Sequence, residues 1–193
     1  MKYDIQAVET VYKGITFRSR LEATWAAMFD LLGWRWEYEC DPINGWLPDF
    51  IVEAKYPGSY IPVEVKPIFE LDYETADKVS KSSRKSLHDE PEPLILGLGP
   101  QDDYDTAILR LGWLNQWSET DGGCGVSWEP AGIIMDGGQY SLSTTLDDQY
   151  PRKCYISRMT GKRIVDQDVV WCRSSVIMEL WGTAKKTVRY RPR

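Results

Sequence analysis

Apolar residues recur at helical spacing near the start of the chain. Residues 17–32 (FRSRLEATWAAMFDLL) carry five of them on one predicted helix face: Leu21, Trp25, Met28, Phe29 and Leu32. Gly33 ends this helix, because glycine is the usual residue just past a helix C-terminus. At about 100° per residue, Glu22 falls beside Phe29 at the margin of the apolar stripe. That position suits a partly buried carboxylate that faces a sheet.

Segments with a period of two follow this helix. In residues 34–39 (WRWEYE) three aromatic residues alternate with charged ones, which is typical of a half-buried strand. Two further strands are expected at 47–54 (LPDFIVEA) and 60–67 (YIPVEVKP), separated by the turn YPGS. The first third of the chain therefore predicts a helix, a strand and a hairpin.

A second helix and a buried strand come next. Residues 72–86 predict a helix that is polar on most faces, with Lys78, Lys81 and Lys85 on one side. The apolar run 93–100 (PLILGLGP) suits a central strand next to a parallel neighbour. This order of elements predicts the α/β class, as a mixed β-sheet flanked by helices.

Beyond Pro100 the pattern weakens. Residues 102–117 indicate a strand, and the glycine-rich stretch 122–138 suggests small β-hairpins. Residues 168–186 predict a C-terminal helix whose apolar surface comprises Val169, Cys172, Val176, Met178, Leu180 and Trp181. We expect one domain, in which this β-rich elaboration (101–193) completes a core formed by residues 1–100.

Composition excludes several classes of protein. The chain has 193 residues, 42% hydrophobic and 27% charged, which is enough for one sizeable core and excludes disordered and collagen-like chains. No apolar run reaches the roughly 18–20 residues that span a bilayer, and the N-terminus lacks the apolar segment of a signal peptide. We therefore expect no membrane partner and a cytoplasmic location. Four widely spaced cysteines and a single histidine, His88, argue for reduced thiols and against a structural zinc site.

Charge is distributed unevenly along the chain. The net charge of -6 and the pI of about 4.9 argue against a protein that coats nucleic acid through its overall charge. Residues 152–193 nevertheless contain 11 basic and 3 acidic residues, whereas the rest contains 12 and 26. This basic segment is either a solubilising tail or a contact for a polyanion, and both readings stay open.

The residues that indicate chemistry lie on the two strands predicted at 47–54 and 60–67. Because side chains alternate along a strand, Glu64 and Lys66 share one face, and the turn between the strands brings Asp49 alongside. Glu22 can approach from the flanking helix. Converging carboxylates form the oxygen-rich site that Mg²⁺ or Mn²⁺ prefers, and a neighbouring lysine can act on an attacking water. The pattern favours metal-assisted hydrolysis of a phosphodiester.

These residues resemble the PD-(D/E)xK nuclease superfamily. Pro48-Asp49 corresponds to the PD element, Glu64-Val65-Lys66 to the ExK element, and Glu22 to an acidic residue that many members carry on the first core helix. The stretches FRSRLEA and DLLGWRWEYE look like small members encoded by phages and prophages, and the likeness covers about residues 16–100. The resemblance implies a restriction-endonuclease-like fold and action in the cytoplasm of a bacterial host cell.

The resemblance also implies roles for individual residues. The metal ligands would be Asp49, Glu64, the Val65 carbonyl and, through water or a second ion, Glu22. Lys66 would act on the nucleophile, and DNA-backbone contacts would come from Lys78, Lys81 and Lys85.

Some further residues have two readings. Arg18 and Arg20 either bind phosphate beside the metal or form a solvated helix end. Trp25, Trp34 and Trp36 occupy periodic core positions, whereas Trp46, Trp113 and Trp117 are candidates for a substrate surface on which bases stack.

The function expected from the sequence is a Mg²⁺- or Mn²⁺-dependent DNA endonuclease that uses two carboxylates and a lysine. One alternative is a catalytically weak or inactive nucleic-acid-binding or anti-defence module on the same fold. Another is a protein-interaction module whose acidic surface binds a partner or mimics DNA. The form of the DNA (a specific site, branched or nicked), the choice between DNA and RNA, and the pairing of two chains in a homodimer stay open.

Overall fold

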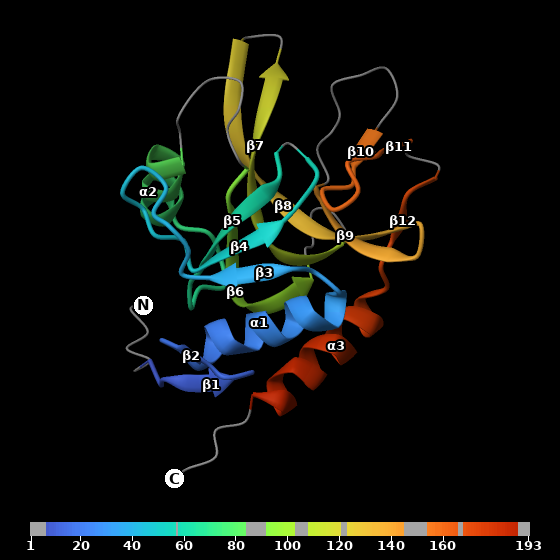
Figure 1. Ribbon diagram of the computed structural model, residues 1–193. Helices are drawn as coiled ribbons and strands as arrows, with labels where there is room; N and C mark the ends of the chain where they lie inside the picture. The colour runs from blue at the N-terminus through green and yellow to red at the C-terminus, as the bar shows by residue number, and fades with distance from the viewer. Residues whose placement is uncertain are drawn as a thin grey trace.

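An eight-stranded mixed β-sheet forms the centre of the protein in a computed structural model, which describes residues 7–56, 58–83, 92–102, 108–120, 123–144, 154–165 and 168–188 (Figure 1). The strand order is β12-β8-β7-β6-β5-β4-β3, and β9 pairs with β8. The strands are β3 (Trp36–Tyr38), β4 (Phe50–Glu53), β5 (Tyr60–Val65), β6 (Leu94–Asp102), β7 (Leu109–Thr120), β8 (Gly123–Asp136), β9 (Gln139–Thr144) and β12 (Val170–Trp171). Within it β5 and β6 run parallel and the other pairs antiparallel, so the predicted mixed α/β class is confirmed.

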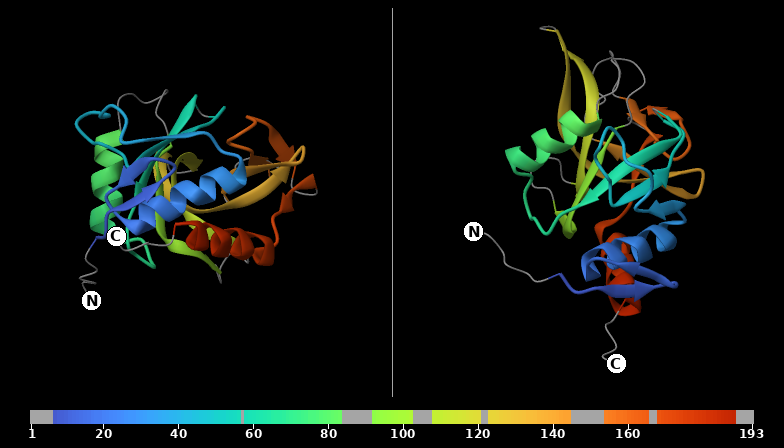
Figure 2. Two further views of the ribbon diagram at one scale, coloured as in Figure 1. Left: turned by 60° about the horizontal axis from the view of Figure 1, so that its bottom comes forward. Right: turned by 60° about the vertical axis from the view of Figure 1, so that its left-hand side comes forward.

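Helices cover both faces of this sheet (Figure 2). Helices α1 (Arg20–Leu32) and α3 (Ser174–Thr187) pack together on one face, where the rings of Trp25 and Trp181 lie 4.5 Å apart. Helix α2 (Tyr73–Ser83) lies on the other face. Alternation along β6 shows the two layers, because Leu94 joins the core cluster with α1 and α3 whereas its neighbour Ile95 joins the cluster with α2.

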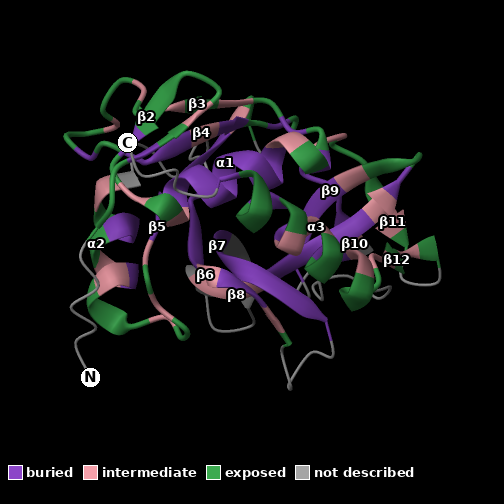
Figure 3. Cartoon of the chain, turned by 90° about the horizontal axis from the view of Figure 1, so that it is seen from below, coloured by how far each residue is buried: buried purple, intermediate pink, exposed green. Residues whose placement is uncertain are grey.

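Helix α1 is buried on nearly every side, as its colouring in Figure 3 shows. It begins at Arg20, three residues later than predicted, because Phe17 belongs to β2 and Ser19 caps the helix by accepting the Glu22 N–H at 3.1 Å. It ends where predicted, at Gly33 in the left-handed conformation with φ of 72°. The cap fixes the position of Glu22 at the start of the helix.

Two small antiparallel sheets flank the main one. The first pairs β1 (Thr10–Tyr12) with β2 (Ile15–Phe17) and lies beside α1. The second pairs β10 (Cys154–Ile156) with β11 (Arg163–Val165). None of these four strands was predicted, and Phe17 of β2 was placed in the helix, because three-residue strands are too short to establish a periodicity.

The glycine-rich middle of the chain differs from the prediction. Instead of small hairpins, β7 and β8 are long paired strands of 12 and 14 residues. Gly112 lies inside β7 because a Cβ there would come within 2.1 Å of the Ile95 carbonyl oxygen. Among the described residues, the turn at Gly137 and Gly138, which joins β8 to β9 with φ of 58° and 83°, matches the predicted kind of connection. Strand β6, which lies mostly in the predicted core 1–100, pairs with β7 from the predicted elaboration 101–193, so both parts contribute to the same sheet.

The C-terminal helix is shorter than the predicted 168–186. Val170 and Trp171 pair with β8 as β12, so Val169 and Cys172 precede the helix. Within α3 the buried residues are Ile177, Trp181 and Ala184, whereas the side chain of Met178 is exposed. The predicted apolar surface is therefore right for Trp181, and for Leu180 and Cys172, which pack against the core, and wrong for Met178.

The remaining composition-based predictions concern membranes and thiols. Within the described ranges, no helix combines the length and apolar character needed to cross a membrane. Cys40 and Cys172 have free thiols. The side chains of Cys124 and Cys154, and the whole of His88, lie outside the described residues.

Candidate active site

One cavity of about 500 Å³ gathers the four residues predicted to be catalytic. It lies at the N-terminal end of α1, where the ends of β4 and β5 meet. Its walls include Arg18, Glu22, Trp46, Asp49, Glu64, Val65, Lys66 and Lys78. Phe50 pairs with Val63 in the β4–β5 hairpin, so one step further along the strands Asp49 stands opposite Glu64.

Asp49 is the most buried carboxylate of this cavity, with 4% of its surface exposed. Its Oδ2 accepts the backbone N–H of Val65 at 2.6 Å, and its Oδ1 forms an ion pair with the guanidinium of Arg18. Burial, and next the charge of Glu64, raise the pKa of Asp49 from 3.8 to about 7. Two buried carboxylates that face each other disfavour their own ionisation and so favour a cation between them.

Glu64 is held by two donors on opposite sides. Its Oε1 pairs with Nζ of Lys66 at 2.5 Å, and its Oε2 accepts the indole N–H of Trp46 at 3.0 Å. Trp46 is buried and closes a tight turn in which Asn44 and Gly45 have φ of 50° and 81°. Trp46 departs from the predicted stacking surface in that only 7% of its surface is exposed and its N–H is engaged, although it still lines the cavity wall.

Trp113 also departs from the predicted substrate surface. It is buried in the cluster beneath α2, with the guanidinium of Arg110 4.3 Å from the centre of its ring. The side chain of Trp117 lies outside the described residues. The core prediction holds for Trp25 and Trp34, which are buried, and Trp36 packs against the same core.

Glu22 enters the cavity from the first turn of α1. Its Oε1 accepts the Ser19 hydroxyl at 2.7 Å and its Oε2 accepts the Tyr38 hydroxyl at 2.5 Å. Burial, followed by the hydrogen bond to Glu22, raises the pKa of Tyr38 to about 12. Tyr38 therefore keeps its proton at neutral pH and remains a donor to Glu22.

Arg18 lies at the mouth of the cavity among three carboxylates. Besides Asp49, its Nε pairs with Oε1 of Glu39 at 2.8 Å and lies 3.9 Å from Oε2 of Glu22. Its side chain is nevertheless 56% exposed. Arg20, two residues later, is exposed and does not line the cavity. Only Arg18 of this pair therefore reaches the site.

Of the three lysines predicted to contact DNA, the two that the structure describes have different surroundings. Lys78 lines the cavity, whereas Lys81 pairs with Asp77 at 2.6 Å one turn earlier on α2. Lys85 lies outside the described residues. A second cavity of about 750 Å³ also has Trp46, Glu64, Lys66 and Lys78 in its wall, so the two cavities are adjacent. Its other wall carries Phe69, Glu70, Asp72 and Glu74.

Every carboxylate oxygen of Glu22, Asp49 and Glu64 has a protein donor. Over the described part of the chain, no three His, Cys, Asp or Glu side chains are arranged as a ready-made metal site. The residues present still fit a divalent cation chemically, because they are hard oxygen donors that converge at one cavity, and the charge of Glu64 adds to burial in raising the pKa of Asp49. Val65 reaches this site through its N–H, whereas the resemblance assigned a role to its carbonyl.

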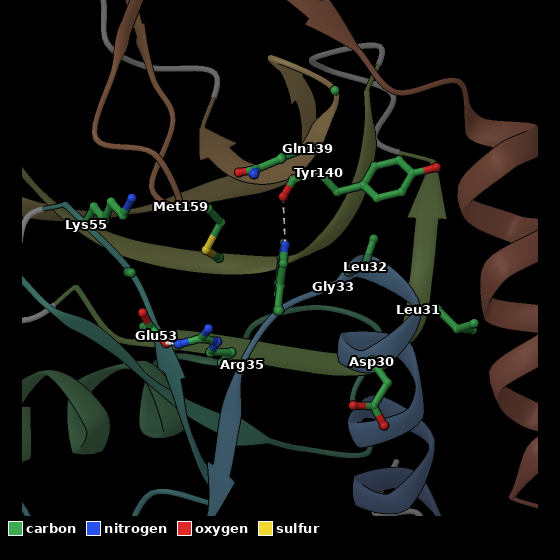
Figure 4. Close-up of a pocket in the computed structure, with 13 residues that line it drawn as sticks. Asp30, Leu31, Leu32, Gly33, Arg35, Glu53, Lys55, Gln139, Tyr140 and Met159 are labelled. Atoms are coloured by element: carbon green, nitrogen blue, oxygen red, sulfur yellow. Dashed lines mark hydrogen bonds and ion pairs between the residues drawn. The ribbon is translucent and has the colours of Figure 1, made fainter.

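A further cavity, of about 550 Å³, lies at the other end of α1 (Figure 4). Trp34 lines it and donates its indole N–H to the Tyr140 carbonyl at 2.8 Å, and Arg35 pairs with Glu53 at 3.4 Å. Asp30 in its wall already accepts from Tyr12, Lys13 and Trp36. Its carboxylates do not converge, so it is a weaker candidate for catalysis.

No family model, curated protein or solved structure matches this chain. The likeness to PD-(D/E)xK nucleases therefore rests on the motif residues alone. Any function must be argued from the geometry of the cavity.

The sequence analysis missed three side-chain donors of the site: Ser19, Tyr38 and Trp46. A signal existed for Ser19, because Ser19-x-x-Glu22 has the spacing of a capping box. Tyr38 and Trp46 reach the carboxylates from elements 16 and 18 residues away, and no local pattern reports such contacts.

Proposed function

We propose that this chain is a Mg²⁺- or Mn²⁺-dependent deoxyribonuclease with a restriction-endonuclease-like core. The observation that carries the proposal is the convergence of Asp49, Glu64 and Lys66 at one cavity, with Glu22 arriving from α1. The arrangement of elements supports it: a helix on one face of the sheet, an antiparallel β4–β5 pair that carries the motif, and a helix leading to the parallel strand β6.

The residues that would hold the divalent cation are Asp49 and Glu64, with Glu22 and the backbone of Val65 beside them. A bound divalent cation lowers the pKa of a coordinated water and neutralises charge on a phosphate. Lys66, whose Nζ lies 2.5 Å from Glu64, is placed to hold the attacking water by a hydrogen bond and to stabilise negative charge on the phosphate.

Arg18 and Lys78 supply positive charge at the cavity for the nucleic-acid backbone. They line the cavity from different parts of the chain, so a phosphate that enters the cavity can meet both cations. The acidic wall of the neighbouring cavity repels phosphate, and this wall would restrict contact to a short length of the strand. This distribution explains how a chain with a net charge of -6 can engage DNA locally.

A second function is a nucleic-acid-binding or anti-defence module on the same fold that cleaves weakly or not at all. The observation that favours it is that every carboxylate oxygen of the site already accepts a hydrogen bond or ion pair from the protein. Such a protein would bind DNA in a salt-dependent manner and leave it intact.

A cleavage assay separates the two functions. Duplex, nicked, branched and single-stranded DNA and an RNA are incubated with the chain in Mg²⁺ or Mn²⁺, with Asp49→Ala as the inactive variant and Arg20→Ala as the matched control. We expect the wild type and Arg20→Ala to cut at least one DNA. Excess EDTA should abolish cleavage by both proteins. Binding without cleavage supports the second function. Equal cleavage by wild type and Asp49→Ala refutes the proposed site.

A further inference from the structure

The six donors to the site carboxylates differ in how easily they can leave. Four belong to the packed structure: the backbone N–H of Val65 and the side chains of Trp46, Tyr38 and Ser19. The other two belong to the charged side chains of Arg18 and Lys66, which are 56% and 37% exposed. These two bind Oδ1 of Asp49 and Oε1 of Glu64, so one oxygen on each facing carboxylate can be released without disturbing the fold.

Arg18 has a second carboxylate partner just outside the cavity. Nε of Arg18 pairs with Glu39 at 2.8 Å, while the terminal nitrogen reaches Asp49. Glu39 does not line the cavity; it follows β3, and its backbone N–H donates to the Asp49 carbonyl at 3.0 Å. Its φ of 47° is a left-handed conformation that costs free energy in a residue other than glycine. The backbone therefore holds Glu39 in an uncommon conformation that places its carboxylate beside Arg18.

We propose that Glu39 is a positioning residue that keeps Arg18 at the mouth of the cavity after Arg18 leaves Asp49. The inference rests on the proposed cation site and deepens it. Without a cation, Arg18 serves as the counter-ion of Asp49. When a cation binds, Arg18 remains anchored to Glu39 through Nε, and its two terminal nitrogens become available to a phosphate of the substrate.

The geometry implies a competition that can be measured without catalysis. Arg18 and a divalent cation compete for Oδ1 of Asp49, so loss of Arg18 strengthens cation binding. Glu39 draws Arg18 away from Asp49, so loss of the Glu39 charge weakens cation binding while Arg18 is present. Glu39 acts through Arg18, and its effect disappears once Arg18 is removed.

Calorimetric titration of the full chain with Mn²⁺ at pH 8 tests this competition. We expect Arg18→Ala to bind Mn²⁺ roughly tenfold more tightly than wild type, on the order of a typical coupling between two ligands. Arg20→Ala removes the same charge two residues away and should stay within about twofold. Arg18→Met, which keeps the aliphatic stem, should behave as Arg18→Ala and serves if the alanine variant does not fold.

A double-mutant cycle tests the role of Glu39. Glu39→Gln should weaken Mn²⁺ binding about fivefold in the wild type and less than twofold in Arg18→Ala. Glu37→Gln, two residues earlier on β3 and exposed, is the matched control and should change little. An equal effect of Glu39→Gln with and without Arg18 overturns the inference, as does an Arg18→Ala affinity no tighter than that of Arg20→Ala.

Asp49→Ala separates failure of the inference from failure of the site. If Asp49→Ala abolishes Mn²⁺ binding while Arg18→Ala leaves it unchanged, the cation site stands and only the role of Arg18 and Glu39 is wrong. If wild type does not bind Mn²⁺, or binds it as Asp49→Ala does, the proposed site is refuted and the inference with it.

Discussion

Two clusters of buried charge differ in how far their cations are exposed to solvent. In one of them, Arg158 is 1% exposed and pairs with Glu92 through two nitrogens, at 2.8 and 3.3 Å. Its guanidinium also donates to Gln116 and to the Ile156 carbonyl. Hydrogen bonds therefore surround an ion pair that is closed off from solvent.

The candidate site has the opposite character. Its three carboxylates, Glu22, Asp49 and Glu64, form ion pairs with Arg18 and Lys66, which are both partly exposed, and Lys78 lines the same cavity. A pair that is closed off from solvent stabilises one conformation, whereas cations that are partly exposed can be exchanged for a ligand. Burial of charge alone therefore does not distinguish a candidate site, and the exposure of the paired cations does.

Loss of Lys66 should have the largest effect, and it should fall on activity. We expect Lys66→Ala to lower kcat about 10³-fold, because a positioned group that stabilises transition-state charge contributes on that order. Its free energy of unfolding should change by less than about 1 kcal/mol, since the side chain is partly exposed. Steady-state cleavage kinetics and urea denaturation measure the two quantities. A loss of stability without loss of kcat would make the cluster structural.

Loss of Arg158 should show the reverse pattern. Arg158→Met removes the guanidinium that pairs with the buried Glu92 and should cost about 3–5 kcal/mol of unfolding free energy, with kcat of the folded fraction unchanged. Urea denaturation gives the stability. Arg163→Met, an exposed arginine on β11, is the matched control and should stay within about 0.5 kcal/mol. Similar values for the two variants would show that the Arg158 pair is not structural.

The next largest effect should be on the pH dependence of stability, which Asp49 controls. The folded-state pKa of Asp49, about 7, lies above the ordinary value of 3.8. The protonated carboxyl therefore contributes fully to the free energy of unfolding below pH 3.8, and this contribution is lost as the pH rises through 7. Asp49→Asn cannot ionise, so the variant should gain on wild type between pH 4 and pH 8, by up to about 4 kcal/mol. Urea denaturation across this range measures the difference. A constant difference would mean that Asp49 ionises normally.

Replacement of Trp46 should have the smallest effect. Trp46→Phe removes the donor to Oε2 of Glu64 without a change in charge, and we expect a loss of about 1–2 kcal/mol in transition-state stabilisation, roughly tenfold in kcat. Trp113→Phe, buried in the same cluster but remote from the carboxylates, is the control for packing. Equal effects of the two variants on kcat would assign Trp46 to packing alone.

Sequence reasoning predicted the first half of the fold because its signals are local. Helical spacing located α1, alternation located β3 to β5, and an apolar run located β6. The same alternation put Glu64 and Lys66 on one face, and the short hairpin turn brought Asp49 opposite Glu64. These are properties of neighbouring residues along the chain.

The rest depended on contacts between distant residues. The length of β7 and β8 follows from pairing with each other and with the sheet, not from a pattern within either strand. The contact of Trp46 with Glu64 depends on a turn with two positive φ values, and that of Tyr38 with Glu22 depends on how α1 crosses β3. Arg18 was predicted at the site, but its ion pairs with Asp49 and Glu39 were not.

Asp49→Asn tests the proposed site most directly, because stability and activity should move in opposite directions in one protein. The measurement is Mg²⁺-dependent DNA cleavage by wild type and Asp49→Asn at pH 8, with the free energy of unfolding determined on the same samples. We expect the variant to be more stable than wild type and to cleave no DNA. Cleavage at the wild-type rate by the folded variant would contradict the assignment of Asp49 to a catalytic cation site.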